Sequence, residues 1–139
     1  MSIIEMNTAL EGLLTTHSEG LVAHERMSAE EIRARINAGA LTLLGNPAHK
    51  NVRPTLIGQP ARVKVNANIG TSPLASDGTG ELDKLRVAET AGADAVMDLS
   101  TAGDLDGIRC RMLAATALPL GTVPLYGLAQ QCTEQGRDP

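Results

Sequence analysis

The spacing of apolar positions separates a helical N-terminal part from a second part in which strands and helices alternate. Over the first 25 residues, apolar side chains recur at mixed helical spacings, which predicts a helix that leans on a larger body. Residues 41–44 form a short apolar run typical of a strand, and residues 45–51 carry the Gly, Asn and Pro of a loop. We therefore assign residues 1–60 to a helical N-terminal arm and its connecting segment.

A second helix is predicted within this arm, over residues 29–38. Ser28 and Glu31 have the spacing of a capping box, in which each side chain accepts a hydrogen bond from a free N–H group of the first turn. Met27 and Ile32 occupy the flanking positions where two apolar side chains can pack together. The glycine at position 39 marks the end of this helix.

From residue 61 the chain repeats a unit of one short apolar strand followed by a helix. The expected elements are a strand at 63–69, a helix at 81–91 closed by Gly92, a strand at 95–99, a helix at 105–115 and a strand at 120–125. This alternation predicts an α/β fold with a parallel sheet wound in one direction by right-handed crossovers. A (β/α)8 barrel of the TIM type fits that winding but takes about 250 residues. We therefore interpret residues 61–139 as the first three βα units of a barrel, truncated after the third strand.

Composition narrows the class of protein. The chain has 139 residues with one Tyr and no Phe or Trp, so the core of one domain, or of part of one, must come from aliphatic side chains. The formal charge of −4 and the scattered basic residues lack the footprint of a nucleic-acid-binding protein. No apolar run is long enough to span a membrane, and Glu5 and Glu11 stand where a signal peptide needs positive charge. We expect a cytoplasmic protein without a nucleic-acid or membrane partner.

Three distinctive residues recur near the ends of the predicted strands at intervals of 29 residues: Asn68, Met97 and Tyr126. Because the carboxyl ends of parallel strands form the catalytic face of a barrel, we expect these residues to converge there. Each has a structural alternative: Asn68 as a turn former, Met97 as core packing and Tyr126 as an anchor between surface and core. The regular interval favours a shared binding site. Other polar residues expected at the same face are Asn66, Asp98, Ser100 and Thr101.

Several other reactive residue types are interpreted as structural, and we assign no catalytic residue. Asp98 points to the opposite side of its strand from the residue before it, which favours a structural ion pair over a role at the rim. Arg109 and Arg111 are expected to be exposed or to form salt bridges. Cys110 is predicted to be a buried small side chain and Cys132 to be exposed and unpaired. The three histidines are too dispersed for a metal site.

The motifs around the three candidates resemble those of one enzyme family. They are VKVNANIGTS at Val63–Ser72, AVMDLST at Ala95–Thr101 and GTVPLY at Gly121–Tyr126. In wording, order and interval they are similar to the thiamine-pyrimidine synthases, also called phosphomethylpyrimidine synthases. The resemblance extends from about Ser28 to about Gly127, which makes it a likeness to the N-terminal portion of that family.

The resemblance implies a function and a site. Members of the family convert 5-aminoimidazole ribotide to hydroxymethylpyrimidine phosphate in a (β/α)8 barrel. By resemblance, the side chains of Asn68, Met97 and Tyr126 contact that small-molecule substrate. An amide can bind polar atoms of the ribose or imidazole, a thioether can pack on a flat heterocycle, and a phenol can donate to phosphate or a ring nitrogen.

The family's chemistry also implies cofactors that this stretch lacks the residues to hold. Its radical rearrangement uses S-adenosylmethionine, a 4Fe-4S cluster and a divalent metal such as zinc, whose cysteine and histidine ligands lie in later parts of the family's chains. We therefore expect a segment that is inactive alone and that forms homo-oligomers or is completed by a C-terminal portion on another chain. Two alternatives stay open: the same segment of the sibling 5-hydroxybenzimidazole synthase, and a non-catalytic remnant that binds the imidazole ribotide.

Overall fold

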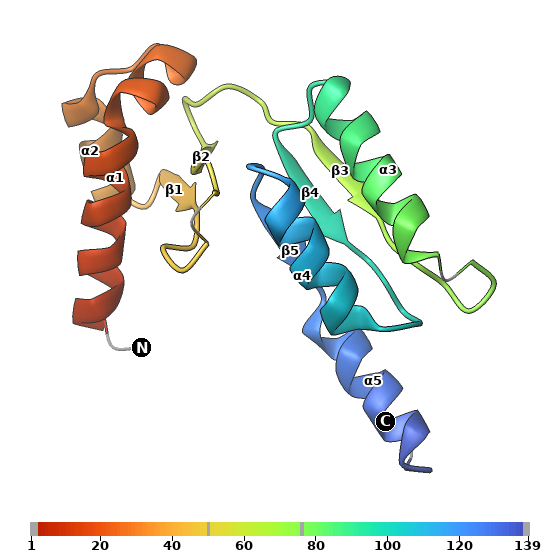
Figure 1. The fold of residues 1–139 in the computed structure, drawn as a ribbon. Helices are drawn as coiled ribbons and strands as arrows, with labels where there is room; N and C mark the ends of the chain where they lie inside the picture. The colour runs from red at the N-terminus through yellow and green to blue at the C-terminus, as the bar shows by residue number, and fades with distance from the viewer. Residues whose placement is uncertain (1–2, 50, 76, 138–139) are drawn as a thin grey trace. The chain divides into compact units, whose positions relative to one another are not determined.

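The computed structural model describes residues 3–49, 51–75 and 77–137, so Lys50 of the predicted loop lies outside the described residues. The chain divides into two compact units, Met1–Lys64 and Val65–Pro139. The first unit contains α1 (Ile3–Glu25), α2 (Ala29–Asn37), β1 (Leu41–Leu44) and β2 (Thr55–Gly58) (Figure 1). The second contains β3 (Asn66–Ile69), α3 (Gly78–Thr90), β4 (Ala95–Asp98), α4 (Leu105–Ala115), β5 (Leu120–Thr122) and α5 (Pro124–Glu134).

Helix α2 begins where the sequence predicts. The Ser28 Oγ atom accepts a hydrogen bond from the N–H of Glu31 at 3.1 Å, which satisfies one free donor of the first turn. The flanking side chains of Met27 and Ile32 are both buried in the core of the first unit. Local capping and apolar packing therefore agree, and the predicted start of this helix is confirmed.

A two-stranded antiparallel sheet completes the first unit. The predicted strand at 41–44 is confirmed as β1, and it pairs with β2 in a register that sets Leu41 opposite Gly58. Strand β2 was not predicted, because its two adjacent apolar residues give no periodicity. Its Leu56 is fully buried against residues of both helices. The core of this unit is formed by Leu14, Leu21, Met27, Ile32, Leu41 and Leu56.

A buried ion pair lies at the end of α1. The side chains of Glu25 and Lys64 are 1% and 5% exposed, and the Lys64 Nζ atom lies 2.8 Å from Glu25 Oε1. The backbone N–H of Arg62 donates to Glu25 Oε2 at 2.8 Å, and His24 Nδ1 lies 3.3 Å from Glu25 Oε1. Burial alone would raise the pKa of Glu25, but the hydrogen bonds from Lys64, Arg62 and His24 outweigh it and hold that pKa below its usual value.

This lowered pKa predicts acid sensitivity of the first unit. A carboxyl group whose pKa is lower in the folded state stabilises the fold above its unfolded pKa, and this contribution is lost as pH falls through the folded value. We therefore expect the contribution of Glu25 to be constant from pH 7 to about 5 and to fall below about pH 4.3. Urea unfolding measured between pH 3 and pH 7 tests this. A Glu25→Gln variant should show a shallower acid-dependent loss, and an unchanged pH profile would contradict the assignment.

The second unit is a parallel sheet in the order β3-β4-β5, covered on one face by helices α3 and α4. Both crossovers run through a helix, as a parallel sheet requires. The predicted α/β arrangement with parallel strands is confirmed, and the described residues form an open sheet of three strands. Its core consists of Leu85, Val96, Ile108, Met112 and Leu118.

Proline ends the third parallel strand earlier than the sequence predicts. Strand β5 stops at Thr122, and Pro124 is the first residue of α5. Proline suits this position because its φ is preset for a helix and it has no N–H to leave unpaired. The prediction of a strand over 120–125 is therefore wrong at its end, and Tyr126 lies in the first turn of a helix.

Two other boundaries move by three residues. Strand β3 begins at Asn66 rather than at residue 63, because Val63 is 86% exposed and its apolar character does not reflect burial. Helix α3 begins at Gly78 rather than at residue 81, because Asp77 Oδ1 accepts a hydrogen bond from the N–H of Thr79 at 2.9 Å and caps the helix.

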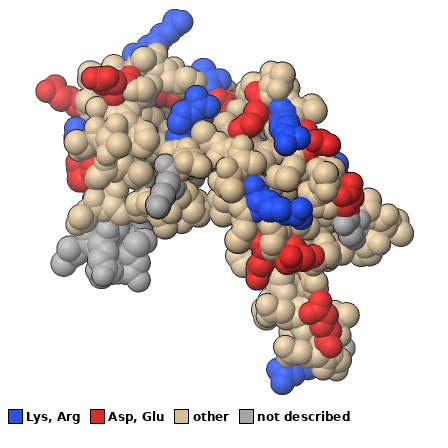
Figure 2. Space-filling model, in the orientation of Figure 1, with Lys and Arg blue, Asp and Glu red and all other residues tan. Residues whose placement is uncertain are grey.

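Charged side chains of both signs are interspersed on the face drawn in Figure 2. That face carries no broad area of basic residues alone, in keeping with the net charge of −4. Among the helices in the described ranges, none is long and apolar enough to cross a membrane.

Candidate functional site

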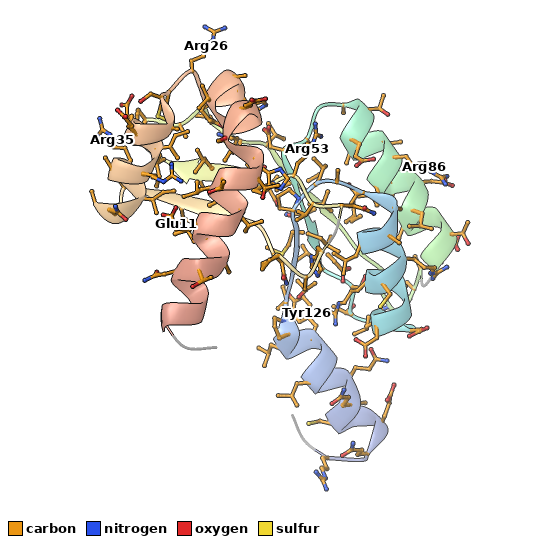
Figure 3. The ribbon with its side chains drawn as sticks, turned by 60° about the vertical axis from the view of Figure 1, so that its left-hand side comes forward. Glu11, Arg26, Arg35, Arg53, Arg86 and Tyr126 are labelled. Carbon is orange, nitrogen blue, oxygen red and sulfur yellow. The ribbon has the colours of Figure 1, made fainter. Side chains whose placement is uncertain are left out.

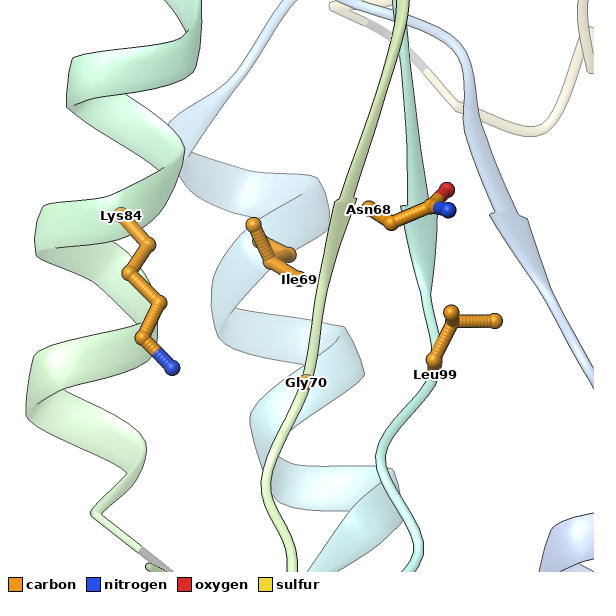
Figure 4. A pocket seen from close by; sticks show the side chains of 5 residues that line it. All are labelled: Asn68, Ile69, Gly70, Lys84 and Leu99. Atoms are coloured by element: carbon orange, nitrogen blue, oxygen red, sulfur yellow. The ribbon is translucent and has the colours of Figure 1, made fainter.

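Two asparagines lie on the face of the sheet that α3 and α4 leave uncovered. Along β3, Asn66 and Asn68 are exposed and alternate with Ala67 and Ile69, which pack toward the helices. The Asn66 Nδ2 atom donates to Asn68 Oδ1 at 2.8 Å, so the two amides are oriented by each other. Figure 4 shows Asn68 on the opposite side of the β3 ribbon from Ile69.

Met97 is the direct neighbour of Asn68 across the sheet. The register pairs Asn68 of β3 with Met97 of β4, and Met97 with Gly121 of β5. A Cβ atom built on Gly121 would lie 3.0 Å from the Met97 Sδ atom, so the thioether lies over this glycine. Gly121 thus makes room for Met97. In the sequence this role has one signal, a residue without a side chain inside an apolar strand.

Tyr126 lies near the same edge of the sheet, but on helix α5 rather than on a strand. It lies four residues beyond the end of β5, in the first turn of α5, and is 37% exposed. Figure 3 shows it at the N-terminal end of that helix. The structure therefore brings Asn68 and Met97 together in register and places Tyr126 just beyond the carboxyl end of the next strand.

A hollow of about 420 Å³ lies at the carboxyl end of β3. It is lined by Asn68, Ile69, Gly70, Lys84 and Leu99 (Figure 4). The Lys84 Nζ atom lies 2.5 Å from Glu81 Oε1, and the Glu81 side chain is only 2% exposed. Lys84 was not predicted, because a Glu and a Lys three residues apart on a helix usually indicate a surface pair.

The turns after β3 and β4 are joined by buried polar contacts. The N–H of Thr71 donates to Ser100 Oγ at 3.0 Å, and the N–H of Thr101 donates to the Thr71 carbonyl oxygen at 3.0 Å. Ser100 is fully buried and Thr71 is 2% exposed. Ser100 was expected at the catalytic face, but its hydroxyl instead joins the two turns, because Thr71 would otherwise carry an unpaired buried N–H.

Asp98 has the structural role that its strand position favoured. It is fully buried, and its Oδ2 atom accepts a hydrogen bond from Arg109 Nε at 2.9 Å. Its Oδ1 atom accepts one from the N–H of Ser100 at 3.0 Å. The salt-bridge interpretation of Arg109 is therefore confirmed, while Arg111 is exposed.

The two cysteines do not lie where the sequence predicts. Cys110 is exposed, because the buried stripe of α4 runs through Ile108 and Met112 and position 110 faces away from it. Cys132 is partly buried rather than exposed. Across residues 3–49, 51–75 and 77–137 no group of three or more His, Cys, Asp and Glu side chains could hold a metal ion. These residues therefore do not fit the ligand set of an iron–sulfur cluster, which needs several thiolates together.

A parallel sheet with polar residues near the carboxyl ends of its strands is the arrangement of α/β enzymes that bind small molecules at that edge. Comparison with known proteins identifies the family within this class. The sequence profile of the radical SAM ThiC family matches residues 4–139, and this chain belongs to that family. This membership confirms the predicted resemblance.

Curated relatives carry the name phosphomethylpyrimidine synthase. The protein from Carboxydothermus hydrogenoformans is 46% identical over 123 residues, which are 88% of this chain and 29% of the relative. The Geobacter metallireducens protein is 44% identical over 93% of this chain and 30% of the relative. The Thermococcus kodakarensis protein is 39% identical over 96% of this chain and 31% of the relative. The chain thus spans about three-tenths of the length of these relatives.

Proposed function

We propose that this chain supplies part of the substrate-binding wall of a phosphomethylpyrimidine synthase, which converts 5-aminoimidazole ribotide to hydroxymethylpyrimidine phosphate in thiamine biosynthesis. The observation that carries the proposal is the pairing of Asn68 and Met97 on the uncovered face of the parallel sheet. Membership in the radical SAM ThiC family and the names of the curated relatives support the reaction.

The architecture supports the same proposal. An uncovered sheet face with helices on the other side is the arrangement of one sector of a (β/α)8 barrel, whose inner face is lined by strand side chains. In our proposal β3, β4 and β5 are the first three barrel strands, and their uncovered face turns inward. Asn68 and Met97 then point into the barrel near its catalytic end, with Tyr126 at the rim.

Each proposed contact has a physical basis. The Asn68 amide, already oriented by Asn66, offers a donor and an acceptor to polar atoms of the ribose or imidazole. The Met97 thioether, placed over Gly121, offers a polarizable surface for the flat imidazole ring. The Tyr126 phenol at the rim can donate to a phosphate oxygen or a ring nitrogen.

The radical SAM family implies S-adenosylmethionine and an iron–sulfur cluster, which together supply a radical that starts the rearrangement. We propose that these groups and the divalent metal are held by other parts of the synthase, so the 139-residue chain is inactive by itself. The part of this chain that the structure describes binds and orients the ribotide. The partner of the chain is then the remaining barrel, on the same or another polypeptide.

The proposal is tested with a chimaera in which this chain replaces the matched segment of the Carboxydothermus hydrogenoformans protein. Turnover of 5-aminoimidazole ribotide to hydroxymethylpyrimidine phosphate supports the proposal. Formation of 5-hydroxybenzimidazole would instead assign the segment to the sibling synthase. Ribotide binding without any product, in a folded chimaera, would favour a non-catalytic binding remnant.

Within this chimaera, Asn68→Ala is expected to raise the KM for the ribotide. Loss of a hydrogen bond in a desolvated site costs about 1–3 kcal/mol, or roughly 5- to 150-fold in binding. The matched control is Asn37→Ala, at the exposed end of α2, which should leave KM unchanged. If Asn68→Ala and the control give the same KM, Asn68 does not contact the substrate.

A further inference from the structure

Arg109 lies between the elements that carry two of the three proposed substrate contacts. It extends from α4, and its side chain is 17% exposed. Its Nε atom donates to Asp98 Oδ2 at 2.9 Å, at the end of β4. Its Nη1 atom lies 3.7 Å from the position that a Cβ atom on Gly127 would take, in the first turns of α5. One guanidinium group therefore donates to the end of β4 and lies beside the first turns of α5.

Each of these two interactions restricts the position of a neighbouring residue in the proposed site. Asp98 directly follows Met97, and its second oxygen accepts a hydrogen bond from the N–H of Ser100 at 3.0 Å. The Arg109–Asp98 pair thus fixes the backbone on the carboxyl side of Met97. Gly127 directly follows Tyr126, so the guanidinium group beside Gly127 limits where the first turn of α5 can lie.

Helix α5 has few other contacts that would fix Tyr126. None of its described residues is buried, and Leu125 and Leu128 are 66% and 55% exposed. The Gln130 Nε2 atom donates to the carbonyl oxygen of Gly103 at 3.1 Å, one turn further along the helix. The guanidinium group of Arg109, beside Gly127, therefore lies closer along the helix to Tyr126 than this hydrogen bond does.

We propose that Arg109 is a positioning residue that sets Tyr126 relative to Met97, a role that rests on the proposed function of those two residues. A planar guanidinium group can donate from Nε to Asp98 while its Nη1 atom lies beside Gly127. A lysine at the same position keeps the positive charge for Asp98 but is a compact point charge that cannot make both contacts. Arg109 therefore couples the end of β4 to the start of α5.

The composition of the chain allows the environment of Tyr126 to be measured directly. With one Tyr and no Phe or Trp, the near-UV circular dichroism of the aromatic side chains comes from Tyr126 alone. In the 139-residue chain, Arg109→Lys is expected to keep the far-UV spectrum and to lose at least about half of the Tyr126 signal, because a freed ring averages over its rotamers. The control is Arg86→Lys on the exposed face of α3, which should leave both spectra unchanged.

A second variant keeps the test decisive if Arg109→Lys fails to fold. Gly127→Val retains Arg109 but places methyl groups where the guanidinium group lies, so it should reduce the Tyr126 signal in the same way. Gly127→Ala places its Cβ at an ordinary van der Waals distance of 3.7 Å and should retain most of the signal. Wild-type near-UV spectra for Gly127→Val would overturn the proposal, as would wild-type spectra for a folded Arg109→Lys.

Steady-state kinetics of the chimaera distinguish a positioning role of Arg109 from an effect on the stability of the fold. Arg109→Lys is expected to raise the KM for the ribotide about tenfold, equivalent to about 1.4 kcal/mol, with a smaller change in kcat. A purely structural role would reduce the amount of folded enzyme and leave KM unchanged. If Asn68→Ala raises KM and Arg109→Lys does not, only the positioning role fails. If neither variant changes KM, the proposed substrate site is wrong as well.

Discussion

Replacing Gly70 with alanine is expected to cause the largest loss of stability in the second unit. Gly70 has φ of 154°, and a Cβ atom there would lie 2.5 Å from the N atom of Ser100 and 2.6 Å from the carbonyl carbon of Leu99. Both are backbone atoms, so no side chain can move aside. The neighbouring backbone is held as well, because the N–H of Leu99 donates to the Ile69 carbonyl oxygen at 2.7 Å.

The expected cost is on the order of 4 kcal/mol, the range of severe steric and backbone defects. Total stabilities of single domains are about 5–15 kcal/mol, so much of the unit would unfold under mild conditions. Urea unfolding followed by far-UV circular dichroism measures the loss. The same change would separate the turns after β3 and β4 and thereby disturb the hollow that Gly70 lines.

Gly92→Ala is the matched control for this prediction. Gly92 has φ of 87°, so alanine is strained there too, but a Cβ atom would meet nothing within 4 Å. Only the conformational cost remains, about 1–2 kcal/mol. If both alanine variants lose the same amount of stability, the close approach of Gly70 to the Leu99–Ser100 backbone is not what the fold depends on.

The second large effect is expected from Lys64→Met in the first unit. This change removes the cation that lies 2.8 Å from the Glu25 carboxylate while that carboxylate stays 1% exposed. The N–H of Arg62 continues to donate to Glu25, but it does not replace the lost charge. Breaking one partner of a buried ion pair costs about 3–5 kcal/mol, and we expect the lower end of that range here. Urea unfolding at pH 7 measures it.

Two further variants test whether the loss of stability comes from the buried ion pair. Arg86→Met removes the partner of Asp83 in a pair whose side chains are 73% and 65% exposed, and it should cost about 0.5 kcal/mol or less. The double variant Lys64→Met with Glu25→Leu should recover much of the loss, because apolar side chains can replace a whole buried pair. A Lys64→Met variant as stable as Arg86→Met would show that the buried pair does not stabilise this unit.

Sequence alone determined the features that depend on residues close together along the chain. The start of α2 follows from the capping pattern at Ser28, and the range predicted for α4 agrees with the structure. The parallel order of β3, β4 and β5 follows from the strand–helix alternation. The family follows from three short motifs whose order and interval survive in the linear sequence.

Only the tertiary structure decided which side chains share a surface. The 29-residue interval predicts that Asn68 and Met97 lie near each other, but the register that sets Met97 directly beside Asn68 and over Gly121 depends on backbone pairing between separate strands. Tyr126 shares the 29-residue interval yet lies on a helix, because Pro124 starts α5 before the strand reaches it. The cysteines were misplaced for a related reason, since burial depends on which helix face meets the sheet and on whether that helix is covered at all.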